Sequence, residues 1–436
     1  MYKTIRENTE QERQLLELNL NEKRHIIPRL LAILLFSAFF VLFDWTYASI
    51  TILLLFLLMA VSMMVLQNGR LTLRITFFHV WMLTFSLFCF LSVIWAWDTD
   101  NAMTKGKTAF SMLICYSLAF LCYQEYDSVD ALLKAVLWGG NAVMLVIFGT
   151  FGVHGILSLL EYGDRLSEQF YLNSNVVGVV CAMSMVVNVY FILEEKRLHW
   201  WNLFLIPGVI ILSATGSRQA LAIMGGGLFL LLFLVVIRGR SPGEIAVLLA
   251  GGILLVAGML VLVSRLPAFS GIYKRMLSMV SAVTGVGKTD RSATTRLALI
   301  DVGLEQFKRT PILGIGMGSG HLVAWKYLNK YFYLHNNFAE VLAGGGLVGF
   351  TIYYSIYVYI FWNFICYRKY STMETAVCAT LLVMALVEDY ASVTYYAKET
   401  YFYLMLCFLE TEKLRRNCRA SLPRMLTLQN NGAERI

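Results

Sequence analysis

Long apolar runs recur along the whole chain, and they constrain its fold more than any other feature. A run of about 18 or more apolar residues crosses a hydrocarbon core roughly 30 Å thick as one helix. Twelve spans are predicted, at residues 26–43, 46–66, 75–96, 108–123, 131–151, 175–193, 202–213, 219–237, 244–264, 340–364, 376–392 and 397–410. Short alternating strands, as in a membrane β-barrel, are not seen, so the expected fold is all-α with about 12 transmembrane helices.

The composition excludes most other classes of protein. The chain is 58% apolar and 15% charged, whereas soluble proteins average about 45–50% and roughly 25%. A cytosolic enzyme, a secreted disulfide scaffold or a nucleic-acid-binding protein is therefore not expected. Most of the eight cysteines lie inside apolar runs and none forms a CxxC pair, so we expect neither disulfides nor a metal site.

The basic residues of the short loops predict the orientation, because Lys and Arg collect on the cytoplasmic side. They fall on one side of the membrane if both termini are cytoplasmic and the number of spans is twelve. The residues concerned are Arg70, Arg74, Lys196, Arg197, Arg238, Arg240, Arg368, Lys369, Lys413, Arg415, Arg416, Arg419 and Arg424. The first 25 residues are polar and mixed in charge, which predicts a cytoplasmic tail rather than a cleaved signal peptide.

This orientation divides the chain into five parts. They are a cytoplasmic tail (1–25), a first helix bundle (26–264), a long extracytoplasmic loop (265–336), the last helices (337–410) and a basic cytoplasmic tail (411–436). The long loop holds ten basic and three acidic residues, which is nearly all of the chain's net charge of +8. A long basic loop indicates a functional segment that binds an anionic ligand. The alternative is contact with anionic lipid headgroups.

Inside the loop, residues 294–309 are predicted to form an amphipathic helix on the membrane interface. Four apolar residues recur at helical spacing, and Thr310-Pro311 ends the pattern. The apolar residues are Leu297, Ile300, Leu304 and Phe307.

A glycine-rich run, Gly314–Gly320, follows this helix, and His335-Asn336 comes shortly before the next span. Glycines allow a tight turn whose backbone N–H groups approach a phosphate, although any tight turn would use them. A histidine at a membrane boundary is usually structural, but its place beside a basic loop makes His335 a candidate proton acceptor.

Other polar residues are predicted at the same outer boundary. Arg218 follows the interruption between spans seven and eight, and its planar guanidinium suits a phosphate; the alternative is contact with lipid phosphate. The Glu388-Asp389 pair either neutralises an arginine or is an alternative proton acceptor. A segment opening span six adds groups suited to sugar hydroxyls, namely Arg165, Asn173 and Asn175.

The order of these motifs resembles the O-antigen ligase and O-antigen polymerase family of bacterial envelope glycosyltransferases. The resemblance covers about residues 160–350 and lies in the order of short motifs. In this sequence they read Ser217-Arg218, Arg296, Pro311-Ile312-Leu313-Gly314-Ile315-Gly316, His335-Asn336 and Gly345-Gly346-Leu347-Val348-Gly349. One departure is Ser174, where the family often has a proline between two asparagines.

The resemblance implies a multi-pass membrane glycosyltransferase of the GT-C-like type, with no cofactor and no metal. Its donor would be a glycan on undecaprenyl diphosphate, used at the outer face of the bacterial cytoplasmic membrane. Polymerases pass the glycan to another lipid-linked repeat unit, and ligases pass it to lipid A-core. Membrane lipids, a flippase and a chain-length regulator are the implied partners.

The expected roles follow from the chemistry of a lipid-diphosphate leaving group. Arg218, with Arg291 or Arg296, is expected to bind the diphosphate, and Arg218 and His335 are the expected catalytic residues. The expected glycan or acceptor ligands are Arg165, Asn173, Asn175 and Asn336. The alternative from another class is a transporter of lipid-linked sugars, although transporters place polar sites near the bilayer midplane and often contain repeats.

Overall fold

The computed structural model describes residues 74–123, 129–162, 173–237 and 291–433, with isolated residues between 30 and 64, Leu166, and residues 243–244. Within these residues every regular element is helical, which confirms the predicted all-α fold. The helices are α3 (Phe77–Leu91), η1 (Ser92–Trp95), α4 (Thr99–Tyr123), α5 (Val129–Tyr162), α7 (Ser174–Glu195), η2 (Trp200–Phe204), α8 (Leu205–Ala214), α9 (Arg218–Val236), α12 (Arg291–Arg309), α13 (Gly320–Leu328), α14 (Asn337–Cys366), η4 (Arg368–Tyr370), α15 (Met373–Ala391) and α16 (Lys398–Ala433).

Five helical segments in the described residues are long and apolar enough to cross a membrane. They are Phe77–Trp95, Val129–Ile156, Ser174–Glu195, Arg218–Val236 and Asn337–Cys366, and each coincides with a predicted span. Four other predicted spans fall on α4, α8, α15 and α16. The predicted spans at 26–43, 46–66 and 244–264 lie wholly or mostly outside the described residues, as do the tail 1–25 and the first part of the long loop.

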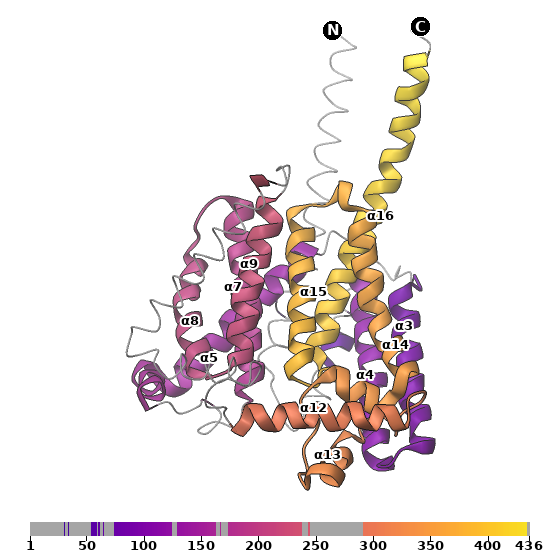
Figure 1. Cartoon of the computed structure of the whole chain (residues 1–436). Coiled ribbons are helices and arrows are strands. Elements are labelled where there is room, and N and C mark those ends of the chain that lie inside the picture. Colours follow the sequence, from indigo (N-terminus) through magenta and orange to yellow (C-terminus); the bar gives the residue numbers. More distant parts are fainter. Residues whose placement is uncertain are drawn as a thin grey trace, which may run out of the picture.

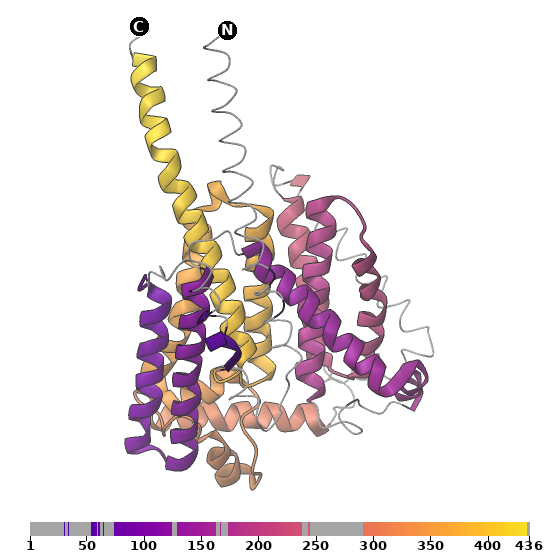
Figure 2. The same ribbon diagram turned by 180° about the vertical axis from the view of Figure 1, so that it is seen from behind.

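The helices form an upright bundle that is closed at one end by a helix lying crosswise. α12 runs across that end, roughly perpendicular to α14 and α15, and α13 lies beside it (Figure 1). The last turns of α16 extend from the opposite end, which is also clear from behind (Figure 2). We call the end that carries α12 and α13 the α12 end.

The bundle core is rich in aromatic residues where α3, α14 and α16 meet. The indole Nε1 of Trp81 donates to the carbonyl of Ile352 over 2.9 Å, which ties α3 to α14. The Trp81 ring also lies 6.3 Å from the ring of Tyr353 and 5.8 Å from that of Tyr401. Such contacts fix the three helices beside one another, because aromatic rings bury large apolar areas with defined geometry.

α14 is interrupted at Gly346, and the glycine-rich run fills the interruption. Gly346 has φ 59° and ψ −161°, outside helical values. The N–H groups of Ile315 and Gly316 donate to the carbonyls of Ala343 and Gly344 over 3.0 and 2.9 Å. In return, two N–H groups of α14 just after the break donate to the carbonyls of Pro311 and Ile312. The exchange satisfies the backbone groups that the break exposes, which buried peptide groups require.

Gly314→Ala is expected to lower the thermal unfolding midpoint of the purified protein. Gly314 has φ +66°, and a Cβ there would lie 2.5 Å from backbone atoms of Gly344. The left-handed backbone alone costs an L-residue about 1–2 kcal/mol. Gly225→Ala in α9 is the matched control, because a Cβ there meets nothing within 4 Å. Equal midpoints for the two variants would contradict this account of the turn.

Candidate functional site

α12 confirms the predicted amphipathic helix, but the face that packs against the rest of the protein is not only the predicted apolar one. Leu304 of that face is exposed. A different face, with Leu299 fully buried, packs on the start of α14. Gly303 allows this approach, because a Cβ there would lie 2.7 Å from Cδ1 of Leu334 and 3.2 Å from Cβ of Ala339. The helix is thereby held against the segment that carries His335.

His335 contacts an aromatic ring and is affected by the charge of an arginine. Its ring centroid is 4.0 Å from that of Tyr333, and its backbone is left-handed, with φ +53°. Burial, together with the positive charge of Arg296 on α12, lowers the pKa of His335 to about 4. The imidazole is therefore uncharged near neutral pH, which is the form that can accept a proton.

Arg218 begins α9 at the same end of the bundle. Ser217 caps the helix, its hydroxyl accepting the N–H of Ala220 over 3.3 Å. The next residue, Gln219, donates to the carbonyl of Glu388 over 3.3 Å and accepts from the hydroxyl of Ser392 over 3.1 Å. The start of α9 is thus fixed to the end of α15.

The start of α14 is fixed to that same end of α15. Asn336 caps α14 by accepting the N–H of Ala339 over 2.8 Å. Its amide nitrogen donates to the carbonyl of Tyr390, also over 2.8 Å. Gln219, next to Arg218, and Asn336, next to His335, both bind the end of α15. Arg218 and His335 therefore both lie at the α12 end of the bundle. The amide of Asn336, expected as a glycan ligand, is engaged within the protein.

The other expected ligands lie at helix starts or outside the described residues. Asn173 is the N-cap of α7, and its side chain accepts the N–H of Asn175 over 3.0 Å. Arg291 is the first residue of α12. Arg165 lies outside the described residues.

The two acidic residues near the end of α15, Glu388 and Asp389, have different surroundings. The Asp389 carboxylate is fully buried and accepts hydrogen bonds from the hydroxyls of Tyr354, over 3.0 Å, and Thr394. Asn337 adds to this network by donating to the Tyr354 hydroxyl over 2.9 Å. Asp389 thus ties α14 to α15, because a buried carboxylate needs such partners. Glu388, the other alternative proton acceptor, is only half-buried.

The glycine-rich run differs from its expected role as a phosphate cradle. The N–H groups of Ile315 and Gly316 bind α14 carbonyls, and that of Met317 donates to the hydroxyl of Ser92 over 3.1 Å. These three donors therefore join the run to α14 and to η1. The run instead positions the next helix, α13, and with it His321.

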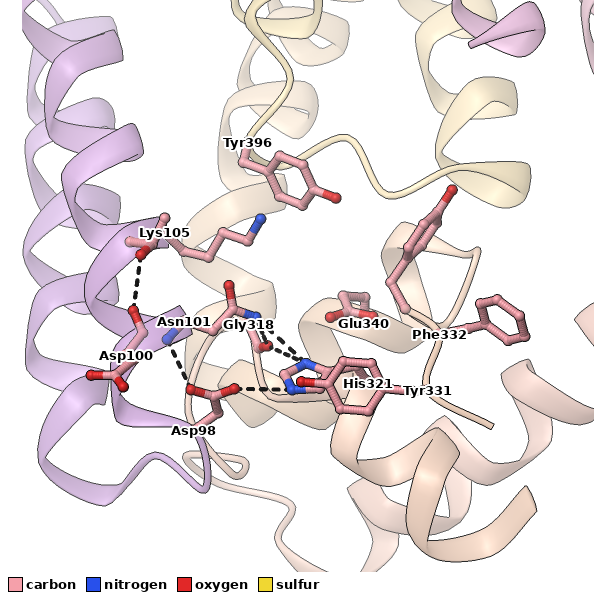
Figure 3. Close-up of a pocket in the computed structure, with 12 residues that line it drawn as sticks. Asp98, Asp100, Asn101, Lys105, Gly318, His321, Tyr331, Phe332, Glu340 and Tyr396 are labelled. Atoms are coloured by element: carbon pink, nitrogen blue, oxygen red, sulfur yellow. Dashed lines mark hydrogen bonds and ion pairs between the residues drawn. The ribbon is translucent and has the colours of Figure 1, made fainter. Parts of the chain in front are cut away.

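A cavity of about 610 Å³ opens beside this run at the α12 end (Figure 3). Its walls come from Asp98 and the start of α4, from Gly318 and α13, from residues 331–333, from the start of α14 and from the segment before α16. One wall is Tyr333, whose ring is also tilted against that of His335, with the centroids 4.0 Å apart. The cavity therefore adjoins the predicted proton acceptor, although neither His335 nor Arg218 is among its lining residues.

An ion pair, Asp98–His321, closes one side of the cavity. The His321 Nε2 is 2.9 Å from the Asp98 carboxylate, and its Nδ1 is 3.1 Å from the carbonyl of Gly318. The same Nδ1 also lies 3.5 Å from the amide nitrogen of Asn101. Asp98 also accepts the N–H of Asn101 over 2.9 Å, which caps the start of α4.

This pair and the cavity were not predicted from the sequence. The available signals were Asp98 just after a predicted span and His321 just after the glycine-rich run. Nothing in the sequence indicates that the two lie together, since they are separated by more than 200 residues. In the described part of the chain, no group of three or more His, Cys, Asp or Glu residues is arranged to hold a metal ion.

The fold and these residues indicate the class of this protein. It is a multi-pass helical membrane protein with a polar site at one end of its helix bundle. The model of the O-antigen ligase family matches residues 203–354, from η2 into α14. That range includes Arg218, Arg296 and His335, whereas Asp98 precedes it. The match confirms the resemblance to the O-antigen ligase and polymerase family, whose members transfer glycans within membranes. A search of curated proteins finds no match to the chain.

Proposed function

We propose that this chain moves a glycan from an undecaprenyl-diphosphate carrier to an acceptor hydroxyl at the outer face of the bacterial cytoplasmic membrane. The favoured reaction is polymerisation of surface-polysaccharide repeat units. The observation that carries the proposal is that Arg218, Arg296 and His335 lie at one end of the bundle, within the region that matches the O-antigen ligase family.

The diphosphate is proposed to bind at the start of α9. Arg218 is the first residue of that helix, where the helix dipole and the first N–H groups favour an anion. A guanidinium there can also form two parallel hydrogen bonds with a phosphate. Arg296, from the crosswise helix α12, is proposed to contribute a second positive charge.

The proposed reaction is a displacement at the anomeric carbon. The acceptor oxygen forms a bond to that carbon, the bond to the carrier diphosphate breaks, and its electron pair remains on the phosphate oxygen. The arginines stabilise this developing charge. The hydroxyl proton passes to His335, and attack from the face opposite the diphosphate inverts the anomeric centre.

Arg296 links diphosphate binding to the basicity of His335. In the free protein, burial and the Arg296 charge hold the pKa of His335 at about 4. A bound diphosphate would neutralise that charge, which raises the pKa of the ring and makes it a stronger base. The proton acceptor would thus become effective only when the donor is in place.

A second candidate is transfer of the glycan to lipid A-core or another non-polymeric acceptor. The matching family model carries the description O-antigen ligase, which favours this reaction. The two reactions share the donor and the roles of the arginines and His335. Envelope glycans of a deletion strain separate them, because loss of long chains with one repeat retained indicates a polymerase. Loss of all attached glycan indicates a ligase.

The proposed function is tested by incubating the detergent-purified protein with lipid-linked repeat units. Chain extension is expected with the wild type and not with Arg218→Ala or His335→Asn. Extension is expected to continue in EDTA, because arginines supply the charge stabilisation that a metal would otherwise give. A transporter would form no product in detergent, so a folded but inactive wild type would contradict the proposal.

A further inference from the structure

The cavity beside the glycine-rich run has the size and the lining of a binding site. Its volume of about 610 Å³ lies within the range of roughly 300–1,000 Å³ typical of small-ligand sites. Its lining combines four aromatic residues with carboxylates, an amide and an ammonium. The aromatic residues are Tyr331, Phe332, Tyr333 and Tyr396. Flat rings pack against the apolar faces of pyranose sugars, while the polar groups can bind hydroxyls.

Lys105 presents hydrogen-bond donors to this cavity. Its Nζ lies 3.4 Å from the centroid of the Tyr396 ring, and Figure 3 shows the ammonium directed across the cavity toward that ring. Burial lowers the pKa of Lys105 from its ordinary value, and the Glu340 carboxylate opposes this effect. An ammonium placed in this way gains from a ligand oxygen that accepts its N–H groups.

Glu340 presents acceptors to the same space. One carboxylate oxygen accepts the N–H of Leu334 over 2.9 Å, which fixes the orientation of the side chain. Gly320 makes room for it, because a Cβ there would overlap both carboxylate oxygens. The side chain is almost fully buried, yet it lines the cavity.

The charges of the lining select among ligands. Three acidic residues, Asp98, Asp100 and Glu340, stand in the lining against the basic residues Lys105 and His321. A carboxylate-bearing sugar would meet an excess of like charge, whereas an uncharged sugar offers both donors and acceptors. Hydroxyl and acetamido groups can pair with both kinds of group in this lining.

We propose that this cavity is a saccharide-binding subsite that holds an uncharged sugar residue of the acceptor. Lys105 donates to a hydroxyl or acetamido oxygen, and Glu340 accepts from a hydroxyl. Tyr333 lines this subsite on one side and contacts His335 with the same ring. A sugar held in the subsite would therefore place a hydroxyl near the proton acceptor. Describing the sugar as the acceptor rests on the proposed function; the binding of a sugar does not.

The test is equilibrium dialysis of the purified full-length protein against three labelled tetrasaccharides, without any donor. The probes are chitotetraose and maltotetraose, which are uncharged, and tetragalacturonate, which carries carboxylates. At least one uncharged probe is expected to bind, at least tenfold more tightly than tetragalacturonate. No binding of either uncharged probe, or tighter binding of tetragalacturonate, would overturn the proposal.

Variants locate the binding. Lys105→Met and Glu340→Gln are each expected to weaken binding of the uncharged probe at least tenfold, and Lys105→Arg by less than threefold. Lys308→Met is the matched control, because Lys308 is exposed on α12 and pairs with Glu305 outside this cavity. Thermal unfolding confirms that each variant is folded. Equal affinities for Lys105→Met, Glu340→Gln and the wild type would overturn the proposal.

The binding test and the transfer test can fail separately. A wild type that binds the uncharged probe through Lys105 and Glu340 but transfers no glycan supports the subsite and contradicts the proposed function. A wild type that transfers glycan, but whose Lys105→Met variant binds the probe unchanged, contradicts the subsite and leaves the function standing.

Discussion

Arg218→Ala is expected to slow glycan transfer by about 10²–10³-fold, which is the usual effect of removing one donor that stabilises developing negative charge. Arg218 begins α9, where the helix N-terminus already favours an anion. Without the guanidinium, the diphosphate leaves with less charge compensation. The rate is measured as extension of lipid-linked repeat units by the purified variant.

Two further variants make the Arg218 result specific. Arg218→Lys keeps the positive charge but loses the planar fork, so a partial recovery of the rate is expected. Arg309→Ala removes the same charge from an exposed position on α12, where Arg309 pairs with Glu305 over 3.7 Å. Its rate is expected to stay within twofold of the wild type. Equal losses for Arg218→Ala and Arg309→Ala would indicate a general effect of charge rather than a binding site.

His335→Asn is expected to lower the transfer rate by about 10²–10⁴-fold, the range typical of a lost general base. Asparagine is preferred to alanine here, because His335 has φ +53° and asparagine tolerates the left-handed region. The change therefore removes the imidazole without straining the turn. His154→Asn is the control, since His154 is exposed on α5. A wild-type rate in His335→Asn would assign the proton to another acceptor, with Glu388 the next candidate.

The pH profile of kcat/KM tests the same residue independently. Burial and Arg296 lower the pKa of His335 to about 4, so the ring is uncharged and competent above that pH. The rate is expected to hold as the pH falls through 6.5, the ordinary histidine value, and to decline only near 4. Arg296→Gln removes the opposing charge, so its decline is expected at a higher pH. A decline near 6.5 in the wild type, unchanged in Arg296→Gln, would contradict this account.

Much of the architecture could be predicted because it depends on local sequence pattern. Apolar length predicts the five spans, and the helical spacing of Leu297, Ile300 and Leu304 predicts α12. The end of α12 follows from Thr310-Pro311, since proline cannot continue the hydrogen-bonding pattern. The family resemblance follows from the order of short motifs along the chain, from Ser217-Arg218 to the glycine-rich segment 345–349.

The parts that could not be predicted depend on contacts between distant segments. Glycines predict a turn, but not that this turn fits into a break in α14, where the N–H groups of Ile315 and Gly316 donate to its carbonyls. Asp98 and His321 carry no sequence signal that pairs them, and hydrogen bonds from Asp98 and Asn101 to the glycine-rich run bring them together. Asp389 is likewise indistinguishable in sequence from a catalytic carboxylate until Tyr354 and Thr394 are seen to bind it.

The central claim is that the α12 end faces outward, where a lipid-diphosphate-linked glycan is presented. Labelling with a membrane-impermeant maleimide tests it most directly, using Trp325→Cys on the exposed side of α13. The native Cys418 on α16, toward the opposite end of the bundle, is the internal control. In intact cells, or spheroplasts if an outer membrane is present, Trp325→Cys is expected to label at once, and Cys418 only after permeabilisation. Labelling of Cys418 but not of Trp325→Cys before permeabilisation would place the arginines and His335 on the cytoplasmic side and contradict the account.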